Sequence, residues 1–311
     1  MREISLWRRA LPGLATLVVV AAVFLIAPRF YNNQLLFFAM MTYMALAQGL
    51  NLLYGFTGYL PFGYVGFFGA GAYATALLVL DAHAPILLAV LGGGVAAAAL
   101  AVILGPLLRL SGAYFSIANL AASQILYYLI SNPNLTNFTG GPYGLKIARV
   151  FDPTASYYSM LAVLLLATLL ACYFRVSQFG MGLKAAMLDP LSAAMAGVNV
   201  VRQRIIVWLI SAGVAGLAGG VYAWSLSVFY PDAVFTLDLS VYAIVFALFG
   251  GVGTVIGPLV GAGILYSLYS GIGVSTPQYF ELIYGCVIVV LVLFLPNGVL
   301  SLLSRRGARV F

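Results

Sequence analysis

Long apolar runs separated by short polar stretches occupy almost the entire chain. About 20 mostly apolar residues cross the hydrocarbon core of a membrane as a helix, so each run of that length is a candidate span. Ten such runs lie near residues 11–27, 35–53, 61–80, 85–108, 112–131, 157–174, 205–229, 239–256, 257–274 and 279–295. If some of them turn back within the membrane, fewer cross it. The pattern predicts an all-α polytopic membrane protein with about 8–10 transmembrane helices and one or two broken or re-entrant segments.

Composition favours one membrane domain without a soluble enzyme domain. Of the 311 residues, 64% are hydrophobic and 7% are charged, and the mean hydropathy is +1.09. The longest polar stretches, 131–158 and 175–204, are too short for a separate catalytic domain. We therefore expect residues 1–311 to form a single transmembrane domain. Cys172 and Cys286 lie within apolar runs and are interpreted as small apolar fillers.

Basic residues orient the spans. Short loops rich in lysine and arginine stay in the cytoplasm. Arginines precede the first span and follow the last one, so both termini are predicted to be cytoplasmic. Alternation then places the loop 175–204 inside and the loop 131–158 outside, although the outer loop holds two basic residues against a single acid. The net charge of +7 is spread over span ends, which does not indicate nucleic-acid binding.

A stretch rich in glycine and aromatic residues interrupts the third predicted span. Residues 57–80 read TGYLPFGYVGFFGAGAYATALLVL, with five glycines and a proline. Irregular backbone at membrane depth is tolerated only where protein shields it or where it borders a water-filled cavity. We therefore predict a broken helix beside a pathway, and a second, weaker interruption at FGGVGT, residues 249–254. Two interrupted segments in one chain favour a transport function.

Other glycines are expected to pack helices together. Small residues let helix backbones approach closely in lipid, where burying apolar surface gains little. Two stripes with a spacing of four residues fit this role: Gly253, Gly257 and Gly261, and Ala212, Gly216 and Gly220.

The sequence offers no internal source of energy for transport. Ion-coupled carriers place acids, histidine or lysine within their spans, whereas the seven acids here lie in loops or within about one turn of a predicted span end. His83, the only histidine, falls in a short outer turn. No G-x-x-x-x-G-K-[ST] phosphate loop surrounds Lys146 or Lys184. Proton coupling and ATP binding by this chain are not expected, while sodium coupling through backbone carbonyls stays open.

The inner loop carries a short helical pattern. Apolar residues repeat at helical spacing between Ser177 and Arg204, basic residues flank them, and Gly197 ends the pattern. Such a helix docks in a groove of a partner protein or rests on lipid headgroups. The residues alone leave both possibilities open.

Polar side chains line one face of two predicted spans, because residues at helical spacing share a face. The first set is Ser116, Asn119, Ser123 and Tyr127, and the second set is Met44, Gln48 and Asn51. Polar stripes in membrane helices either hydrogen-bond to neighbouring segments or line a wet path. A third set, the aromatic residues Tyr54, Phe62 and Tyr64, either packs or acts as a gate. All three sets are candidate pathway residues.

Five ordered motifs resemble a known family. They are GLNLLYGFTGYLPFGYVGFFGAGAYATALL at 49–78, RLSGAYFSIANLAASQIL at 109–126, TGGPYGL at 139–145, SQFGMGLKAA with AAMAGVNV at 177–200, and LFGGVGTVIGPLVGA at 248–262. Their order is similar to that in LivM-type permeases, the inner-membrane subunits of branched-chain amino acid ABC importers. The resemblance extends from residue 40 to LPNGVL at 295–300.

The resemblance implies a passive pathway subunit in a bacterial or archaeal plasma membrane. Such a subunit pairs with a homologous LivH-like permease and binds no cofactor of its own. Two cytoplasmic ATPases hold ATP and Mg and act on the inner loops, and a periplasmic or lipid-anchored protein delivers the solute. The loop 175–204 would be the coupling loop, with Gly180, Lys184, Asp189 and Gly197 as its residues. Tyr143 would meet the solute or the binding protein outside.

Three positions depart from the family pattern. Family members often have a histidine at Tyr64, an arginine at Met187 and an acid at Pro190. Because proline has no backbone N–H and tends to begin or end a helix, Asp189 is predicted to cap a second short helix. Tyr64 leaves the solute open between branched-chain amino acids and the urea, short amides and aromatic acids that related systems carry.

Other classes of function fit the residues less well. A stand-alone secondary carrier or channel would need no partner, and ATP-independent accumulation by the purified chain would identify it. A membrane-embedded enzyme needs acids, histidines or metal ligands grouped at the membrane surface, and the sequence offers no such group. A structural scaffold has no use for interrupted helices.

Overall fold

The computed structural model describes residues 2–30 and 33–275, together with residues 282, 285, 286, 289 and 298–300. Most of the predicted span 279–295 and the basic C-terminal residues therefore lie outside the described part of the chain. The α-helices are α1 (Arg2–Phe30), α2 (Gln34–Thr57), α3 (Val65–Leu80), α4 (Ile86–Ile103), α5 (Ala113–Ile130), α6 (Thr136–Thr139), α7 (Pro153–Val176), α8 (Gln178–Leu188), α9 (Pro190–Met195), α10 (Val200–Leu226), α11 (Pro231–Phe235), α12 (Leu237–Gly250) and α13 (Ile256–Ser275).

Short elements fill the connections between these helices. The 3-10 helices are η1 (Gly105–Arg109), η2 (Pro133–Leu135), η3 (Gly141–Tyr143) and η4 (Ala148–Val150). Strands β1 (Leu145–Lys146) and β2 (Val228–Phe229) pair antiparallel, with Leu145 opposite Phe229. This pairing ties the predicted outer loop 131–158 to the end of α10.

The helices match the predicted spans. Seven are long and apolar enough to cross a membrane: Gln34–Thr57, Ile86–Ile103, Ala113–Ile130, Pro153–Val176, Val200–Leu226, Pro231–Gly250 and Ile256–Gly273. Gly13–Arg29 within α1 and Val65–Leu80 in α3 are shorter apolar helices. Nine of the ten predicted spans therefore have counterparts among the described residues, although their ends shift. The prediction of an all-α polytopic membrane protein is confirmed.

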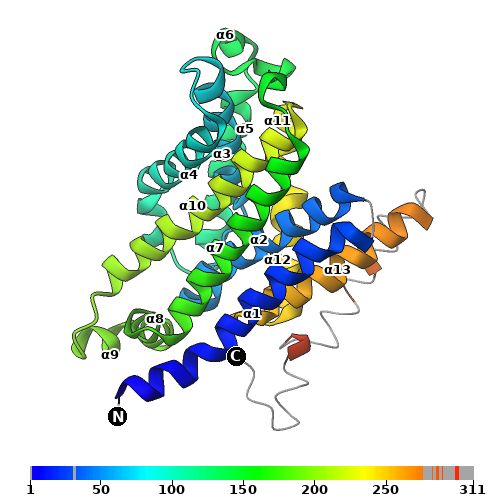
Figure 1. Ribbon diagram of the computed structural model, residues 1–311. Coiled ribbons are helices and arrows are strands. Elements are labelled where there is room, and N and C mark those ends of the chain that lie inside the picture. Colours follow the sequence, from blue (N-terminus) through cyan, green and yellow to red (C-terminus); the bar gives the residue numbers. More distant parts are fainter. Residues whose placement is uncertain are drawn as a thin grey trace.

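The predicted loops gather at opposite ends of the bundle. The N-terminus, α8 and α9 lie at one end, and α6 lies at the other (Figure 1). The loop 175–204 therefore shares a side with the N-terminus, and the loop 131–158 is on the far side, as the alternation of spans predicts. We call these the loop-helix end and the far end.

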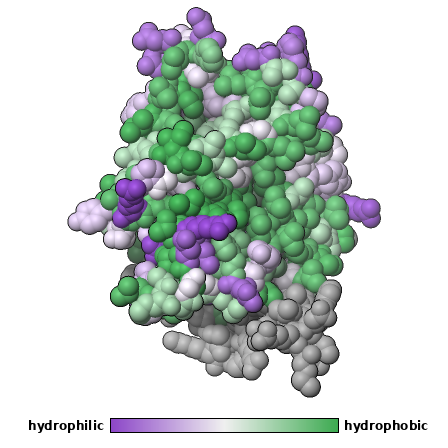
Figure 2. All heavy atoms as spheres, turned by 90° about the vertical axis from the view of Figure 1, so that its left-hand side faces the viewer, coloured by the Kyte–Doolittle hydropathy of each residue, from purple (hydrophilic) through white to green (hydrophobic). Residues whose placement is uncertain are grey.

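Apolar side chains remain exposed on the outer helices. On α1 and α4 they include Val18, Val19, Val23, Leu87, Leu88, Leu91, Val95, Val102 and Ile103. The face in Figure 2 is mostly hydrophobic, with hydrophilic residues gathered at its upper end and in smaller groups lower down. Extended apolar surface of this kind suits contact with lipid or with another membrane subunit.

Glycines bring α3, α4 and α10 together at the centre of the bundle. A Cβ atom on Gly71 of α3 would collide with the backbone of Gly216 in α10, and one on Gly219 would collide with the Phe68 carbonyl oxygen. The predicted stripe through Gly216 and Gly220 is thus a packing face. The Trp208 indole Nε1–H of α10 donates to the carbonyl of Ala101 in α4 at 2.8 Å, which joins α10 to α4 as well.

A pair of alanine substitutions within α10 tests this packing. Gly219→Ala is expected to lower the unfolding temperature in detergent and to reduce the yield of folded protein, because α3 must move away from α10. Gly213→Ala is the matched control, since its Cβ would lie 3.7 Å from the Gly94 carbonyl oxygen, an ordinary contact. That control should be neutral or stabilising, because alanine favours a helix over glycine by about 1 kcal/mol. Equal unfolding temperatures for the two variants would contradict the packing account.

Both predicted interruptions are present. The first interruption, residues 58–64, separates α2 from α3, and the second interruption, residues 251–255, separates α12 from α13. The predicted stripe of Gly253, Gly257 and Gly261 is wrong in one member. Gly253 lies in the second interruption with φ +75° rather than on a helix, because the chain must reverse there. Gly257 and Gly261 do pack closely, against Gly251 and Phe246 respectively.

Candidate functional site

The candidate functional site consists of the two interruptions and the helices α8 and α9, which we call the loop helices. The first interruption begins where α2 ends: Gly58 adopts φ +78° and its N–H donates to the Tyr54 carbonyl at 2.9 Å. This left-handed geometry favours glycine, because a side chain would meet the following carbonyl. The chain then continues through Tyr64 and starts α3 at Val65.

The polar face of α5 supports the first interruption. Ser116 Oγ donates to the Leu60 carbonyl at 2.7 Å, and Asn119 Oδ1 accepts from the Gly63 N–H at 2.8 Å. Ser123 lies against Gly66, and its buried hydroxyl has no hydrogen-bond partner among the described residues. Backbone groups that lack helical partners need such compensation at membrane depth. The structure therefore brings Ser116, Asn119 and Ser123 to one place, while their role as pathway residues stays a prediction.

The three predicted aromatic residues do not form a cluster. Tyr64 is buried, and its hydroxyl donates to the Ser211 carbonyl in α10 at 2.8 Å. Phe62 is 40% exposed, and Tyr54 is half-buried. No ring contact joins any two of the three within the described part of the chain. Tyr64 thus anchors the interruption to α10, because its long side chain reaches a neighbour across the bundle. A gating role for Tyr54 and Phe62 stays a prediction.

The second interruption is held by two buried amides of α2. Asn51 Oδ1 accepts from the Gly253 N–H at 2.7 Å, and its Nδ2 donates to the Thr254 carbonyl at 2.9 Å. Gln48 Nε2 donates to the Val255 carbonyl at 2.7 Å. Both amide side chains have an exposed fraction of 0%. The polar stripe of α2 was predicted either to hydrogen-bond to a neighbouring segment or to line a wet path. The observed contacts are hydrogen bonds to a neighbouring segment, the second interruption.

The loop helices start and stop where the sequence predicts. The side chain of Asp189 accepts from the Leu191 N–H at 3.0 Å and caps α9, which confirms the predicted second helix. The Ser192 hydroxyl also donates to this carboxylate and lowers the pKa of Asp189 below its ordinary value. Gly197 follows α9 with φ +88°, and the Val198 N–H returns to the Ala193 carbonyl at 3.0 Å. This hydrogen bond and the positive φ of Gly197 are typical of a helix C-terminus at which glycine is preferred.

Cationic side chains seat the loop helices against the first interruption. The Lys184 ammonium of α8 lies 5.2 Å from the ring centre of Phe56, and the Arg204 guanidinium lies 5.2 Å from the ring centre of Tyr59. A cation over an aromatic face is attracted by the ring quadrupole. Burial, and to a lesser degree the nearby Arg175, lowers the pKa of the Lys184 amino group from its ordinary value. A displacement of α8 therefore acts on the end of α2.

Arg175 connects the loop helices to the second interruption. This residue lies in the last turn of α7, just before α8, and its Nη1 donates to the Gly253 carbonyl at 2.9 Å. Gly180 at the start of α8 approaches the Phe174 carbonyl so closely that a Cβ atom would collide with it. The two helix ends that flank the loop helices thus contact the interruptions: the end of α7 contacts the second one, and the start of α10 contacts the first one.

At the far end of the bundle, the structure also describes the predicted residues Tyr143 and Tyr127 and the acids near the start of α12. Tyr143 in η3 has an exposed fraction of 77%, which agrees with its predicted place outside the bundle. The Tyr127 hydroxyl donates to Asp232 Oδ1 at 2.6 Å and joins α5 to α11. The span that was predicted to begin at 239 begins at Pro231. Asp232 is therefore within one turn of the span end, as predicted, whereas the prediction is wrong for Asp238, which lies further inside the span. The short helix α11 adds these residues to the span.

Sequence reasoning also missed Arg175, Ser211 and Ser240. Ser240 Oγ accepts from the Val65 N–H at 2.8 Å, and the Ser211 hydroxyl donates to the Gly49 carbonyl at 2.7 Å. The sequence signal for Ser211 and Ser240 was a serine surrounded by apolar residues in a predicted span. The hydroxyl of such a serine generally hydrogen-bonds to a neighbouring helix. The sequence marked Arg175 only as a basic residue at the end of a predicted span. Such a residue indicates how the span is oriented in the membrane, but it does not indicate which segment the side chain contacts.

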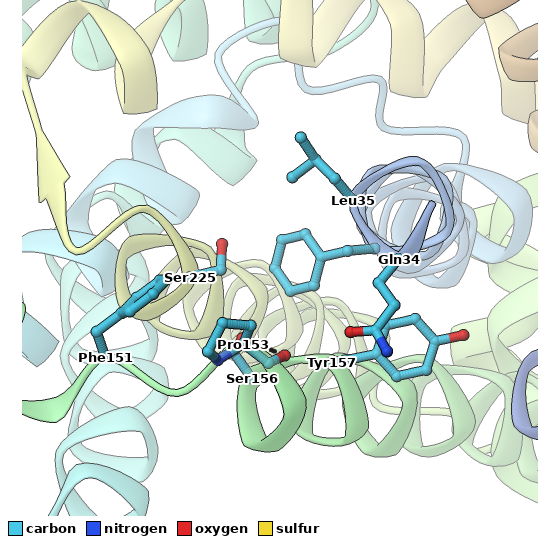
Figure 3. A pocket seen from close by; sticks show the side chains of 8 residues that line it. Gln34, Leu35, Phe151, Pro153, Ser156, Tyr157 and Ser225 are labelled. Carbon is cyan, nitrogen blue, oxygen red and sulfur yellow. Dashed lines mark hydrogen bonds between the residues drawn. The ribbon is translucent and has the colours of Figure 1, made fainter. Parts of the chain in front are cut away.

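A pocket at the far end contains none of the predicted site residues. It has a volume of about 140 Å³ and lies where α2, α7 and α10 meet (Figure 3). Gln34 and Tyr157 line one side of it, and Phe151 lines the other, with Ser225 between them. The Tyr157 hydroxyl is engaged with the Phe24 carbonyl at 2.7 Å. This pocket is separate from both interruptions.

Comparison with known families decides the class of the protein. The family described as "Branched-chain amino acid transport system / permease component" matches residues 33–292, which is most of the chain. The chain belongs to this permease family. The resemblance to LivM-type permeases is thereby confirmed, and the permease is a multi-pass membrane protein of the ABC transporter class.

Individual relatives agree with the family. The permease is 28% identical to the high-affinity branched-chain amino acid transport permease LivM of Escherichia coli K12, over 84% of this chain and 68% of the relative. It is 24% identical to LivH of Salmonella typhimurium, over 84% of this chain and 91% of the relative. A fructose import permease, FrcC of Rhizobium meliloti, is 32% identical over 43% of this chain and 39% of the relative. No solved structure matches the permease.

Proposed function

We propose that this permease forms the solute pathway of an ATP-driven importer for branched-chain or related amino acids, together with a homologous LivH-like permease. Separate ATPase subunits drive it, and the chain has no catalytic role. The observation that carries the proposal is that α8 and the two helix ends that flank the loop helices contact the interrupted segments. Lys184 of α8 lies over Phe56 at the end of α2, Arg204 of α10 lies over Tyr59 of the first interruption, and Arg175 of α7 bonds to Gly253 of the second interruption. The names of the LivM and LivH relatives support the amino-acid solute and the paired permease.

The loop helices are well suited to receive a force from a partner. Their exposed apolar side chains are Met181, Met187, Leu188, Leu191 and Met195. An amphipathic helix with such residues docks in an apolar groove of another protein. We infer that a cytoplasmic ATPase supplies this groove, and that ATP and Mg bind there. Gly180, Lys184, Asp189 and Gly197 shape the loop helices that the ATPase moves.

The proposal also fixes the orientation in the membrane. The loop-helix end faces the cytoplasm, where basic residues are retained, and the far end faces outside. A periplasmic or lipid-anchored binding protein then delivers the solute near Tyr143. We place the complex in the plasma membrane of a bacterium or archaeon. The pathway contains Gln48, Asn51, Tyr54, Phe62, Tyr64, Ser116, Asn119 and Ser123, either as lining residues or as supports of the interruptions.

Reconstitution tests the proposal. The permease is assembled in liposomes with a LivH-like permease, two ATPases and an internal or external supply of ATP, and a binding protein is added. We expect accumulation of labelled leucine that stops when ATP is withheld. Labelled urea, a short amide and an aromatic acid are tested in parallel. Accumulation of one of these instead of leucine would refute the solute assignment, and accumulation that ignores ATP would refute the class of mechanism.

A further inference from the structure

A polar pocket lies at the far end, between α5, α11 and α12. Its volume is about 250 Å³, far more than the roughly 10–15 Å³ that one water needs. The lining residues are Gln124, Tyr127, Asp232, Phe235, Thr236 and Leu237. We call it the Asp232 pocket. It combines one carboxylate, one amide and two hydroxyls with two apolar side chains, which is a suitable lining for a small solute.

The carboxylate of Asp232 lies at the far end of the bundle. Asp232 is the second residue of the apolar stretch Pro231–Gly250, which is long enough to span a membrane, and its side chain is exposed. Its hydrogen-bond partner is the neutral Tyr127 hydroxyl, and no ion pair to Asp232 is found among the described residues. A negative charge without a basic partner is available to a cation from outside the chain.

The Asp232 pocket is close to the first interruption. The Phe235 ring lies against Gly69, one turn into α3, and would collide with a Cβ atom there. Ser240, in the first turn of α12, accepts from the N–H of Val65, the first residue of α3. The junction of α11 and α12 therefore lies beside the start of α3. Irregular backbone of this kind is tolerated at membrane depth where it borders a cavity.

The chemistry of the pocket matches a zwitterion. The exposed Asp232 carboxylate attracts a protonated amine that reaches the pocket. The Gln124 amide is a hydrogen-bond donor for the carboxylate of the same solute, while the Thr236 hydroxyl donates to Asp238 Oδ2 at 3.4 Å. Phe235 and Leu237 provide apolar contacts for an aliphatic side chain.

We propose that the Asp232 pocket binds the protonated amino group of the solute on its way into the membrane, and so favours amino acids over urea, amides and acids without an amino group. This inference rests on the proposed import function and names its solute class. It makes Asp232 a binding residue, with Tyr127 holding its carboxylate in place.

A thiol-labelling experiment tests the charge of the pocket without any transport. Thr236→Cys is introduced into a chain with Cys172→Ala, Cys286→Ala and Asp238→Asn, the last because the Asp238 carboxylate accepts from the Thr236 hydroxyl at 3.4 Å and would also attract a cationic reagent. The purified protein in nanodiscs is treated with a cationic and an anionic methanethiosulfonate reagent. Relative to a free thiol, the cationic reagent should react at least about tenfold faster than the anionic one, because of the nearby carboxylate. Asp232→Asn should remove this preference. A preference that survives Asp232→Asn, or no preference at all, would overturn the inference.

Leucine uptake by the complete transporter tests the same residue in function. Asp232→Asn keeps an oxygen that accepts from the Tyr127 hydroxyl but removes the charge, and we expect uptake to fall about tenfold. Asp238→Asn is the matched control, since it removes a carboxylate of the same span that lies outside the pocket, and uptake should be unchanged. Normal uptake with Asp232→Asn but loss with Asp232→Ala would show an anchor rather than a binding residue.

The two experiments separate this inference from the proposed function. If the wild-type transporter accumulates no amino acid, the proposed function fails. In that case the ratio of the reaction rates of the cationic and anionic reagents still tests whether the pocket prefers cations. If the wild type accumulates leucine and Asp232→Asn does so equally, the proposed function stands and the inference is wrong.

Discussion

Replacing Gly197 with tryptophan is expected to abolish solute-stimulated ATP hydrolysis while leaving the permease folded and inserted. Gly197 has φ +88° at the end of α9, and a Cβ atom there meets none of the described residues within 4 Å apart from its own chain neighbours. The strain of a side chain in this left-handed conformation costs roughly 1–2 kcal/mol, which one membrane domain tolerates. The indole then occupies the surface that we assign to the ATPase. The measurement is ATP hydrolysis by the complete transporter, with and without solute and binding protein.

Gly112→Trp is the matched control for this variant. Gly112 also has a positive φ, +56°, and also has open space around it, but it lies before α5 and outside the loop helices. Both substitutions therefore place a side chain at a positive φ. Solute-stimulated hydrolysis should persist in Gly112→Trp. Undiminished stimulation in Gly197→Trp would refute the coupling assignment, provided that the variant is inserted.

Replacing Asn51 with leucine is expected to destabilise the permease by about 2–6 kcal/mol, because each buried polar group left without a partner costs about 1–3 kcal/mol. The Gly253 N–H and the Thr254 carbonyl both lose their hydrogen bonds to this side chain, and the Gln48 amide oxygen loses the bond that it accepts from Asn51 Nδ2. Leucine has the same branching of side-chain heavy atoms as asparagine but cannot form these hydrogen bonds. We expect a lower unfolding temperature in detergent and loss of stimulated ATP hydrolysis, since the second interruption is no longer held to α2.

Asn137→Leu provides the comparison for Asn51→Leu. Asn137 is exposed in α6 at the far end, and its side chain makes no hydrogen bond within the described structure. The unfolding temperature of this variant should match that of the wild type. If Asn51→Leu matches it as well, the amide does not hold the second interruption, and the account of the site is wrong.

The membrane fold was predictable from sequence because its dominant signal is apolar run length. Nine of the ten predicted runs are helices within the described part of the chain, and the two glycine-rich stretches are interruptions, since irregular backbone at membrane depth leaves a strong compositional trace. Asp189 and Gly197 were predictable for a local reason. A capping carboxylate before proline and a glycine after a helix act within a few residues of themselves.

The contacts that define the candidate site were not predictable in the same way. Arg175 bonds to Gly253, 78 positions away, and Tyr64 bonds to Ser211, 147 positions away. Periodicity places a residue on a helix face but does not say which segment lies opposite. The polar stripe of α5 was found, but its partners at Leu60 and Gly63 were not. Asp238 was misplaced because the short helix α11, which begins with proline, extends the span beyond its most apolar part.

The central claim is that this permease has no internal motor and receives force through the loop helices. The most direct test is leucine accumulation in liposomes that contain either the permease alone or the complete transporter, with an imposed proton or sodium gradient and no ATP. We predict no accumulation in either preparation, and accumulation by the complete transporter once ATP is supplied. Concentrative uptake by the permease alone, driven by an ion gradient, would contradict the account.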